Sequence, residues 1–108
     1  MSGPESKIEY YLKKRVVASG GRVRKLRWIG QRGAPDRFIW WPEEQKGMGP
    51  IACLVEVKAP GKKATAQQLR EHARLRADGF SVVVAASVEE VDAMIENMMG
   101  MRTTESVH

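Results

Sequence analysis

One apolar segment ends in a charged pair, and this ending constrains the fold more than any other feature of the sequence. Residues 51–58 have the alternating pattern of a strand. In a strand, Glu56 and Lys58 share one face and lie about 7 Å apart, with apolar neighbours on the other face. A turn at Pro60 follows almost at once. Because charges buried without partners are costly, this pair requires a metal ion, a salt bridge or water.

A second carboxylate is expected at the same end of the sheet. The motif Gly33-x-Pro35-Asp36 directly precedes another apolar strand, residues 37–41. Two carboxylates and a lysine at one sheet edge suit a divalent cation, and such a cation suits a phosphodiester. Taken singly, these residues have simpler interpretations. Asp36 after a proline is a common turn residue, and Glu56 with Lys58 can be an ion pair on an exposed sheet face.

The composition indicates one soluble domain with a basic surface. The 108 residues, 43% hydrophobic and 29% charged, suffice for one modest core. A net charge of +5 favours a polyanionic partner. The single cysteine, Cys53, excludes an internal disulfide and suggests a reducing, cytoplasmic compartment. No apolar run approaches the roughly 20 residues of a membrane span, and the first residues do not begin a signal peptide.

The hydrophobic periodicity predicts the element order α-β-β-β-α-β-α. Helices are expected at about 4–18, 65–78 and 88–98, and strands at 22–29, 37–41, 51–58 and 81–85. The first three strands can form an antiparallel meander, and the fourth, after a crossover helix, requires a parallel neighbour. The expected fold is α/β, a mixed four-stranded sheet flanked by helices. One domain spans residues 1–108, with a core from about 4 to 99 and a polar, flexible tail from 100 to 108.

Together, these motifs resemble the virus-type replication-repair nuclease (VRR-NUC) domain of the PD-(D/E)xK nuclease superfamily. The resemblance covers nearly the whole chain and rests on Glu9 in the first helix, Gly33-x-Pro35-Asp36, Glu56-x-Lys58 with the Ala-Pro-Gly-Lys-Lys that follows, and Gln68. It implies a restriction-endonuclease-like core and metal-dependent hydrolysis of phosphodiester bonds in DNA. The short stand-alone members of the family resemble Holliday-junction resolvases and are expected to be homodimers. The family name points to phage replication and DNA repair.

The resemblance implies catalytic and metal-binding roles for the strand residues. Asp36 and Glu56 would ligate Mg²⁺ or Mn²⁺, hard cations that prefer oxygen ligands. The backbone carbonyl of Val57 is a further ligand by resemblance alone. Lys58 would position the attacking water or steady the negative charge that develops during the reaction.

Two helical residues complete the catalytic set that the resemblance implies. Glu9 would fill a second metal position or hold an outer-shell water, and Gln68 would orient water or phosphate. Both also fit local capping boxes, Glu9 with Ser6 and Gln68 with Thr65. His72 has no second histidine nearby and is expected to be a surface or packing residue.

Seven basic residues on both sides of the expected site are predicted to contact phosphates of DNA. They are Arg22, Arg24, Lys25, Arg27, Arg32, Lys62 and Lys63. The sequence thus predicts a Mg²⁺- or Mn²⁺-dependent, structure-specific endonuclease that cuts branched DNA, such as a four-way junction, as a homodimer. Its expected location is the cytoplasm of a bacterium or a phage-infected host cell. The alternatives are a nuclease acting on flaps, ends or duplex DNA, and a catalytically inactive basic DNA-binding module.

Overall fold

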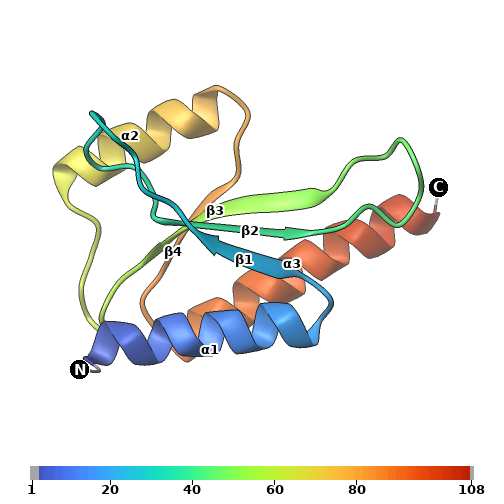
Figure 1. The fold of residues 1–108 in the computed structure, drawn as a ribbon, viewed down its shortest axis with the longest axis horizontal. Coiled ribbons are helices and arrows are strands. Elements are labelled where there is room, and N and C mark those ends of the chain that lie inside the picture. The colour runs from blue at the N-terminus through green and yellow to red at the C-terminus, as the bar shows by residue number, and fades with distance from the viewer. Residues whose placement is uncertain (1–2, 108) are drawn as a thin grey trace.

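The computed structural model describes residues 3–107, with side chains through Met101, and arranges them in three layers (Figure 1). A four-stranded sheet lies between helices α1 and α3 on one face and helix α2 on the other. The elements are α1 (Pro4–Ala18), β1 (Arg22–Lys25), β2 (Arg37–Trp41), β3 (Ile51–Val57), α2 (Ala66–Ala77), β4 (Val82–Ala85) and α3 (Val88–Val107). The predicted order and fold class are confirmed.

The strand order is β1-β2-β3-β4, with antiparallel pairing except between β3 and β4, which are parallel. This is the meander with a crossover strand that the sequence predicts. The register pairs Arg37 of β2 with Val55 of β3. One residue farther along, Asp36 therefore lies opposite Glu56. The beginning of β2 and the end of β3 meet at one end of the sheet.

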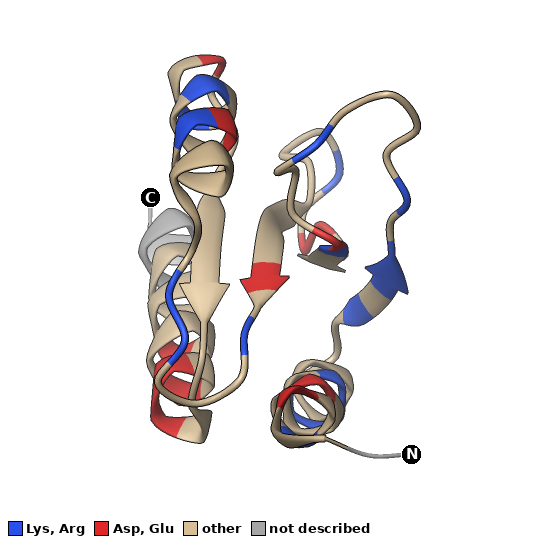
Figure 2. Cartoon of the chain, turned by 90° about the vertical axis from the view of Figure 1, so that its left-hand side faces the viewer, with Lys and Arg blue, Asp and Glu red and all other residues tan. Residues whose placement is uncertain are grey.

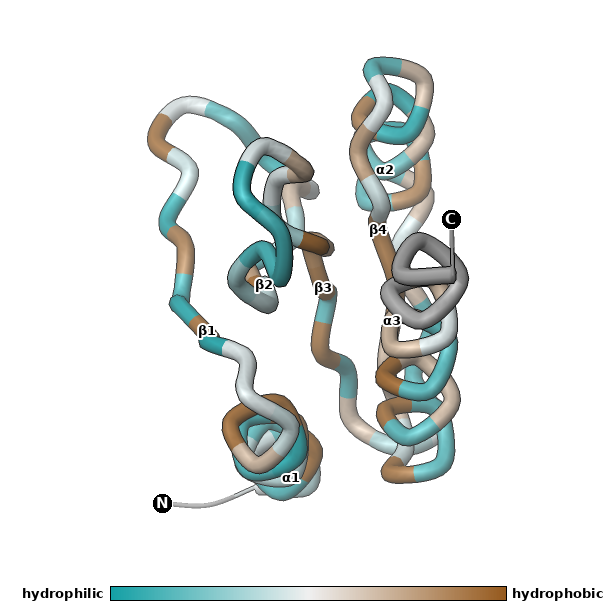
Figure 3. The backbone as a smooth tube through the Cα atoms, turned by 90° about the vertical axis from the view of Figure 1, so that its right-hand side faces the viewer, coloured by the Kyte–Doolittle hydropathy of each residue, from teal (hydrophilic) through white to brown (hydrophobic). Residues whose placement is uncertain are grey.

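The larger core fills the space between the sheet and helices α1 and α3. Every second residue of β2 and β3 points into it. Figure 3 shows hydrophobic stretches along β3 and along α3. Burial of each large aliphatic side chain contributes about 1.5–3 kcal/mol. The buried members are Ile8, Leu12, Val16, Ile39, Trp41, Cys53, Val55, Val57, Ala85, Val91, Met94, Ile95 and Met98.

A smaller core joins α2 to the opposite face of the sheet. Leu54 of β3, Leu75 of α2 and Val82 of β4 form its buried centre. Arg76 of α2 reinforces this contact, because its Nε and Nη2 donate hydrogen bonds to the Val82 carbonyl at 3.2 and 2.8 Å. Helix α2 is thereby held beside the end of β3, where Glu56 is located.

The structure corrects two predicted boundaries. Strand β1 ends at Lys25 rather than near residue 29, because the segment opposite it leaves the sheet before Asp36 and packs on α2 at Gly33. The Asp36 carbonyl still accepts a hydrogen bond from the Leu26 N–H at 2.8 Å. The last helix continues through Gly100 to Val107, where the sequence predicts a tail. A glycine costs a helix only about 1 kcal/mol relative to alanine, too little to end it alone. His108 lies outside the described residues.

Across residues 3–107, no helix combines the length and the apolar character needed to cross a membrane.

Candidate functional site

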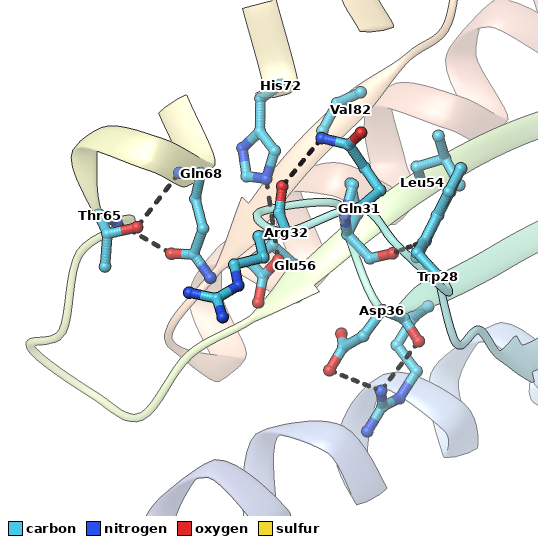
Figure 4. A network of polar contacts seen from close by, with 12 residues as sticks. Trp28, Gln31, Arg32, Asp36, Leu54, Glu56, Thr65, Gln68, His72 and Val82 are labelled. Carbon is cyan, nitrogen blue, oxygen red and sulfur yellow. Dashed lines mark hydrogen bonds and ion pairs between the residues drawn. The ribbon is translucent and has the colours of Figure 1, made fainter. Parts of the chain in front are cut away.

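Two carboxylates lie opposite each other where β2 begins and β3 ends. The N–H of Lys58 donates to the carbonyl of Ala85 in β4 at 2.9 Å. Backbone groups alternate in direction along a strand, so those of Glu56 also point to β4 and away from β2. Asp36 and Glu56 therefore form a non-hydrogen-bonded antiparallel pair. The Cα atoms of such a pair are about 4.5 Å apart, with both side chains on one face. Figure 4 shows Glu56 between Asp36 and His72 of α2.

The environment of Glu56 disfavours its ionised form. The side chain is buried, and this burial, followed by the negative charge of Asp36, raises the pKa of Glu56 from an ordinary 4.5 to about 7. The positive charges of Lys58 and Arg37 act in the opposite direction. Asp36 Oδ1 and Glu56 Oε1 are both buried without a hydrogen-bond partner among the described residues. Such oxygens are costly unless a cation or a donor satisfies them.

A third oxygen is available beside these carboxylates. The backbone groups of Glu56 point to β4, so those of Val57 point to β2. The position opposite Val57 is Pro35, two residues beyond the pair formed by Arg37 and Val55. Because proline has no N–H, the ladder cannot supply a donor to the Val57 carbonyl.

These oxygens suit a hard divalent cation. Among residues 3–107, no group of three or more His, Cys, Asp and Glu side chains is gathered for metal binding. Mg²⁺ usually requires only one or two carboxylates, since waters and substrate phosphates complete its shell. The side chains of Asp36 and Glu56, with the Val57 carbonyl, therefore form a donor set that fits Mg²⁺ or Mn²⁺.

Arg37 is a site residue that sequence reasoning missed. Its side chain is only 4% exposed and forms ion pairs with Glu9 of α1, through Nη2, and with Asp36 Oδ2, through Nη1 at 2.9 Å. Nη1 also donates to the Asp36 carbonyl at 3.0 Å. Glu9 therefore reaches the site through Arg37. The sequence contains a signal, because Arg37 alternates with the inward-facing Ile39 and Trp41, and a buried arginine requires carboxylate partners.

His72 is a second residue whose position the sequence did not reveal. It is fully buried, as a packing residue should be, but its Nε2 lies 3.8 Å from Glu56 Oε1. That distance is too long for a hydrogen bond. Burial lowers the pKa of His72 and raises that of Glu56, so the contact is between two groups that favour their neutral forms. The only sequence signal is that His72 follows Gln68 by one helical turn.

The capping role of Gln68 is confirmed. The Thr65 N–H donates to Gln68 Oε1 at 2.9 Å, and the Gln68 N–H donates to Thr65 Oγ1 at 3.1 Å. The side-chain oxygen of Gln68 thus holds the first turn of α2 (Figure 4). A role at the site is left to its amide nitrogen and remains a prediction.

The loop before Asp36 packs on this first turn of α2. Gly33 has a φ of +83°, and a Cβ there would lie 2.9 Å from the Gln67 carbonyl oxygen. The loop is also tied to α2 by Gln31, whose Nε2 donates to Glu71 Oε1 at 3.1 Å. The glycine of the Gly-x-Pro-Asp motif therefore allows the loop before Asp36 to approach α2 closely.

The seven basic residues predicted to contact DNA are all exposed. Arg22, Arg24 and Lys25 lie on β1, and the others lie in the loops that follow β1 and β3. Figure 2 shows basic segments along β1 and its following loop. Arg24 also lies over the Trp40 ring, 5.3 Å from its centroid, which offers a flat aromatic and cationic surface.

Known proteins share this fold and much of this sequence. The family model described as "VRR-NUC domain" matches residues 15–89, a range that includes Asp36, Glu56, Lys58 and Gln68 but not Glu9. "Putative nuclease p44" of Acyrthosiphon pisum secondary endosymbiont phage 1 is 46% identical over 83 residues, which cover 77% of this chain and 83% of that protein. A solved structure described as a VRR-NUC domain has a TM-score of 0.76 and 40% identity, covering 88% of this chain and 97% of that chain.

Proposed function

The chain belongs to the VRR-NUC domain family of PD-(D/E)xK nucleases, and on this premise we propose that it is a metal-dependent endonuclease acting on branched DNA. One observation carries the proposal. Asp36 and Glu56, distant in sequence, lie opposite each other with buried carboxylate oxygens that have no partner among the described residues. The ion pair between Asp36 and Arg37 uses Asp36 Oδ2, so Asp36 Oδ1 and Glu56 Oε1 are left for a cation.

Each protein group has a defined task in phosphodiester hydrolysis. Asp36, Glu56 and the Val57 carbonyl would hold Mg²⁺ or Mn²⁺, which when bound supplies positive charge and Lewis acidity at the phosphodiester. Lys58 lies on the same sheet face as Glu56, where its ammonium group positions the attacking water or steadies the developing negative charge. The amide nitrogen of Gln68 orients water or phosphate from the first turn of α2.

The substrate is proposed to be branched DNA bound by a homodimer. The exposed basic residues of β1 and the two loops can contact phosphates, which position a substrate without reading its sequence. Two copies related by a twofold axis would match the symmetry of a four-way junction and widen the contact surface of a short chain. The proposed location is the cytoplasm of a bacterium or a phage-infected cell.

A comparison of DNA substrates tests this function. In Mg²⁺, we expect an immobile four-way junction to be cut faster than a flap or a linear duplex by at least about tenfold, or ~1.4 kcal/mol of transition-state discrimination. Removal of the ion with EDTA should abolish cutting of all three. Equal cutting of all substrates would indicate a nuclease without structure specificity. Binding of DNA with no Mg²⁺-dependent cutting would instead identify an inactive binding module.

A further inference from the structure

We propose that the Arg37 guanidinium occupies the place of a second cation, so that this site holds one divalent ion and Glu9 is not among its ligands. The proposal rests on the proposed function, since it concerns the ion assigned to Asp36 and Glu56. In it, Arg37 is a positioning residue, which acts on the reaction only through Asp36, and Glu9 is the counter-ion of Arg37.

The two carboxylate oxygens of Asp36 have different environments, because only one of them contacts Arg37. Asp36 Oδ2 accepts from Arg37 Nη1 at 2.9 Å, and the same nitrogen holds the Asp36 backbone carbonyl at 3.0 Å. Asp36 Oδ1 is buried and has no hydrogen-bond partner among the described residues. The arginine therefore fixes the rotation of the carboxylate and directs its remaining oxygen to the side where Glu56 lies.

The second terminal nitrogen of the guanidinium pairs with the carboxylate of Glu9. Arg37 Nη2 forms an ion pair with Glu9 Oε1, and the whole arginine side chain is almost completely buried. A two-metal nuclease site places its ions about 3.5–4 Å apart and uses carboxylates to hold them. The oxygens that a second ion would need, Asp36 Oδ2 and Glu9 Oε1, are the oxygens that Arg37 contacts.

Displacing this arginine with a divalent ion would cost much free energy. A guanidinium does not lose its proton in proteins, so the positive charge between Glu9 and Asp36 is permanent. Moving a buried arginine away from its carboxylate partners leaves a charge uncompensated. A second ion at this place would also lie next to a fixed like charge.

A Mn²⁺ titration of the full chain, followed by the electron paramagnetic resonance signal of free Mn²⁺, tests the proposal. We expect one ion per chain for the wild type. Arg37→Met should bind two, because the substitution removes the charge and releases Glu9 and Asp36 Oδ2. The double variant E9Q/R37M should return to one ion, and Arg37→Lys, which keeps the charge, should remain at one.

Glu9→Gln is the matched variant that leaves Arg37 in contact with Asp36. Its stoichiometry should stay at one ion, with a dissociation constant within about threefold of the wild type. If circular dichroism shows that Arg37→Met does not fold, the titrations of the wild type and of Glu9→Gln still test the inference. Two ions per wild-type chain, or loss of an ion on Glu9→Gln, would overturn the inference while the proposed function stands. Absence of Mn²⁺ binding by the wild type would overturn the proposed function itself.

Discussion

Replacing Asp36 with asparagine is expected to reduce Mg²⁺-dependent cleavage about a thousandfold or more, ~4 kcal/mol, while DNA binding persists. Asparagine keeps the shape of the side chain and an oxygen that can face Arg37. It removes the negative charge that, together with Glu56, would hold the cation. The exposed basic residues proposed to contact phosphates are unchanged, so affinity for a four-way junction in EDTA should remain close to that of the wild type.

The matched control is Asp78→Asn, the same chemical change at the exposed C-cap of α2. It should cleave at the wild-type rate. Cleavage is measured at fixed Mg²⁺ with a labelled junction, and binding is measured by gel shift. Wild-type cutting by Asp36→Asn would mean that the metal site is elsewhere. Parallel loss of binding and cutting would mean that Asp36 contributes to the DNA-binding surface rather than to the ion.

Glu56→Gln should abolish cleavage and yet stabilise the metal-free protein at pH 8. Burial and the charge of Asp36 raise the pKa of Glu56 from 4.5 to about 7. Between these values the folded protein binds a proton that the unfolded chain has released, so stability falls as pH rises through this window. Above pH 7 the ionised Glu56 lowers the free energy of unfolding by about 3 kcal/mol. Glutamine removes this loss because its side chain carries no charge.

Urea denaturation in EDTA at pH 5.0 and pH 8.0 measures this effect. The wild type should lose more stability than Glu56→Gln between these two pH values, and the variant should be the more stable protein at pH 8. Added Mn²⁺ should stabilise the wild type at pH 8 but not the variant, since only the wild type is expected to bind the ion. Glu96→Gln, an exposed acid on α3, should follow the wild-type pH dependence. A variant less stable than the wild type at pH 8 contradicts the account.

The sequence predicted the fold because each element has a local signal. Apolar alternation marks β2 and β3, and the Thr65 box marks the start of α2. The meeting of Asp36 and Glu56 followed from the antiparallel arrangement alone, since the beginning of one strand must adjoin the end of the other. The end of β1 was not predicted because it depends on where the opposite segment leaves the sheet, which is a property of pairing rather than of β1 itself.

The rest of the site depends on tertiary contacts that no local pattern contains. The contact between His72 and Glu56 is set by the way α2 crosses β3, and the helical pattern shows only which face His72 shares with Gln68. The same holds for Glu9, which the sequence places on the first helix but not beside Arg37. Arg37 itself was predictable in principle, because a charged residue at an inward position of β2 requires partners.

Asp36 and Glu56 are proposed to share one divalent ion at the end of the sheet. The most direct measurement is the anomalous difference map of a crystal soaked in Mn²⁺. We expect a peak between Asp36 and Glu56, about 2 Å from an oxygen of each carboxylate. A well-soaked crystal with no peak there, or with an ion that contacts only one of the two carboxylates, would contradict it.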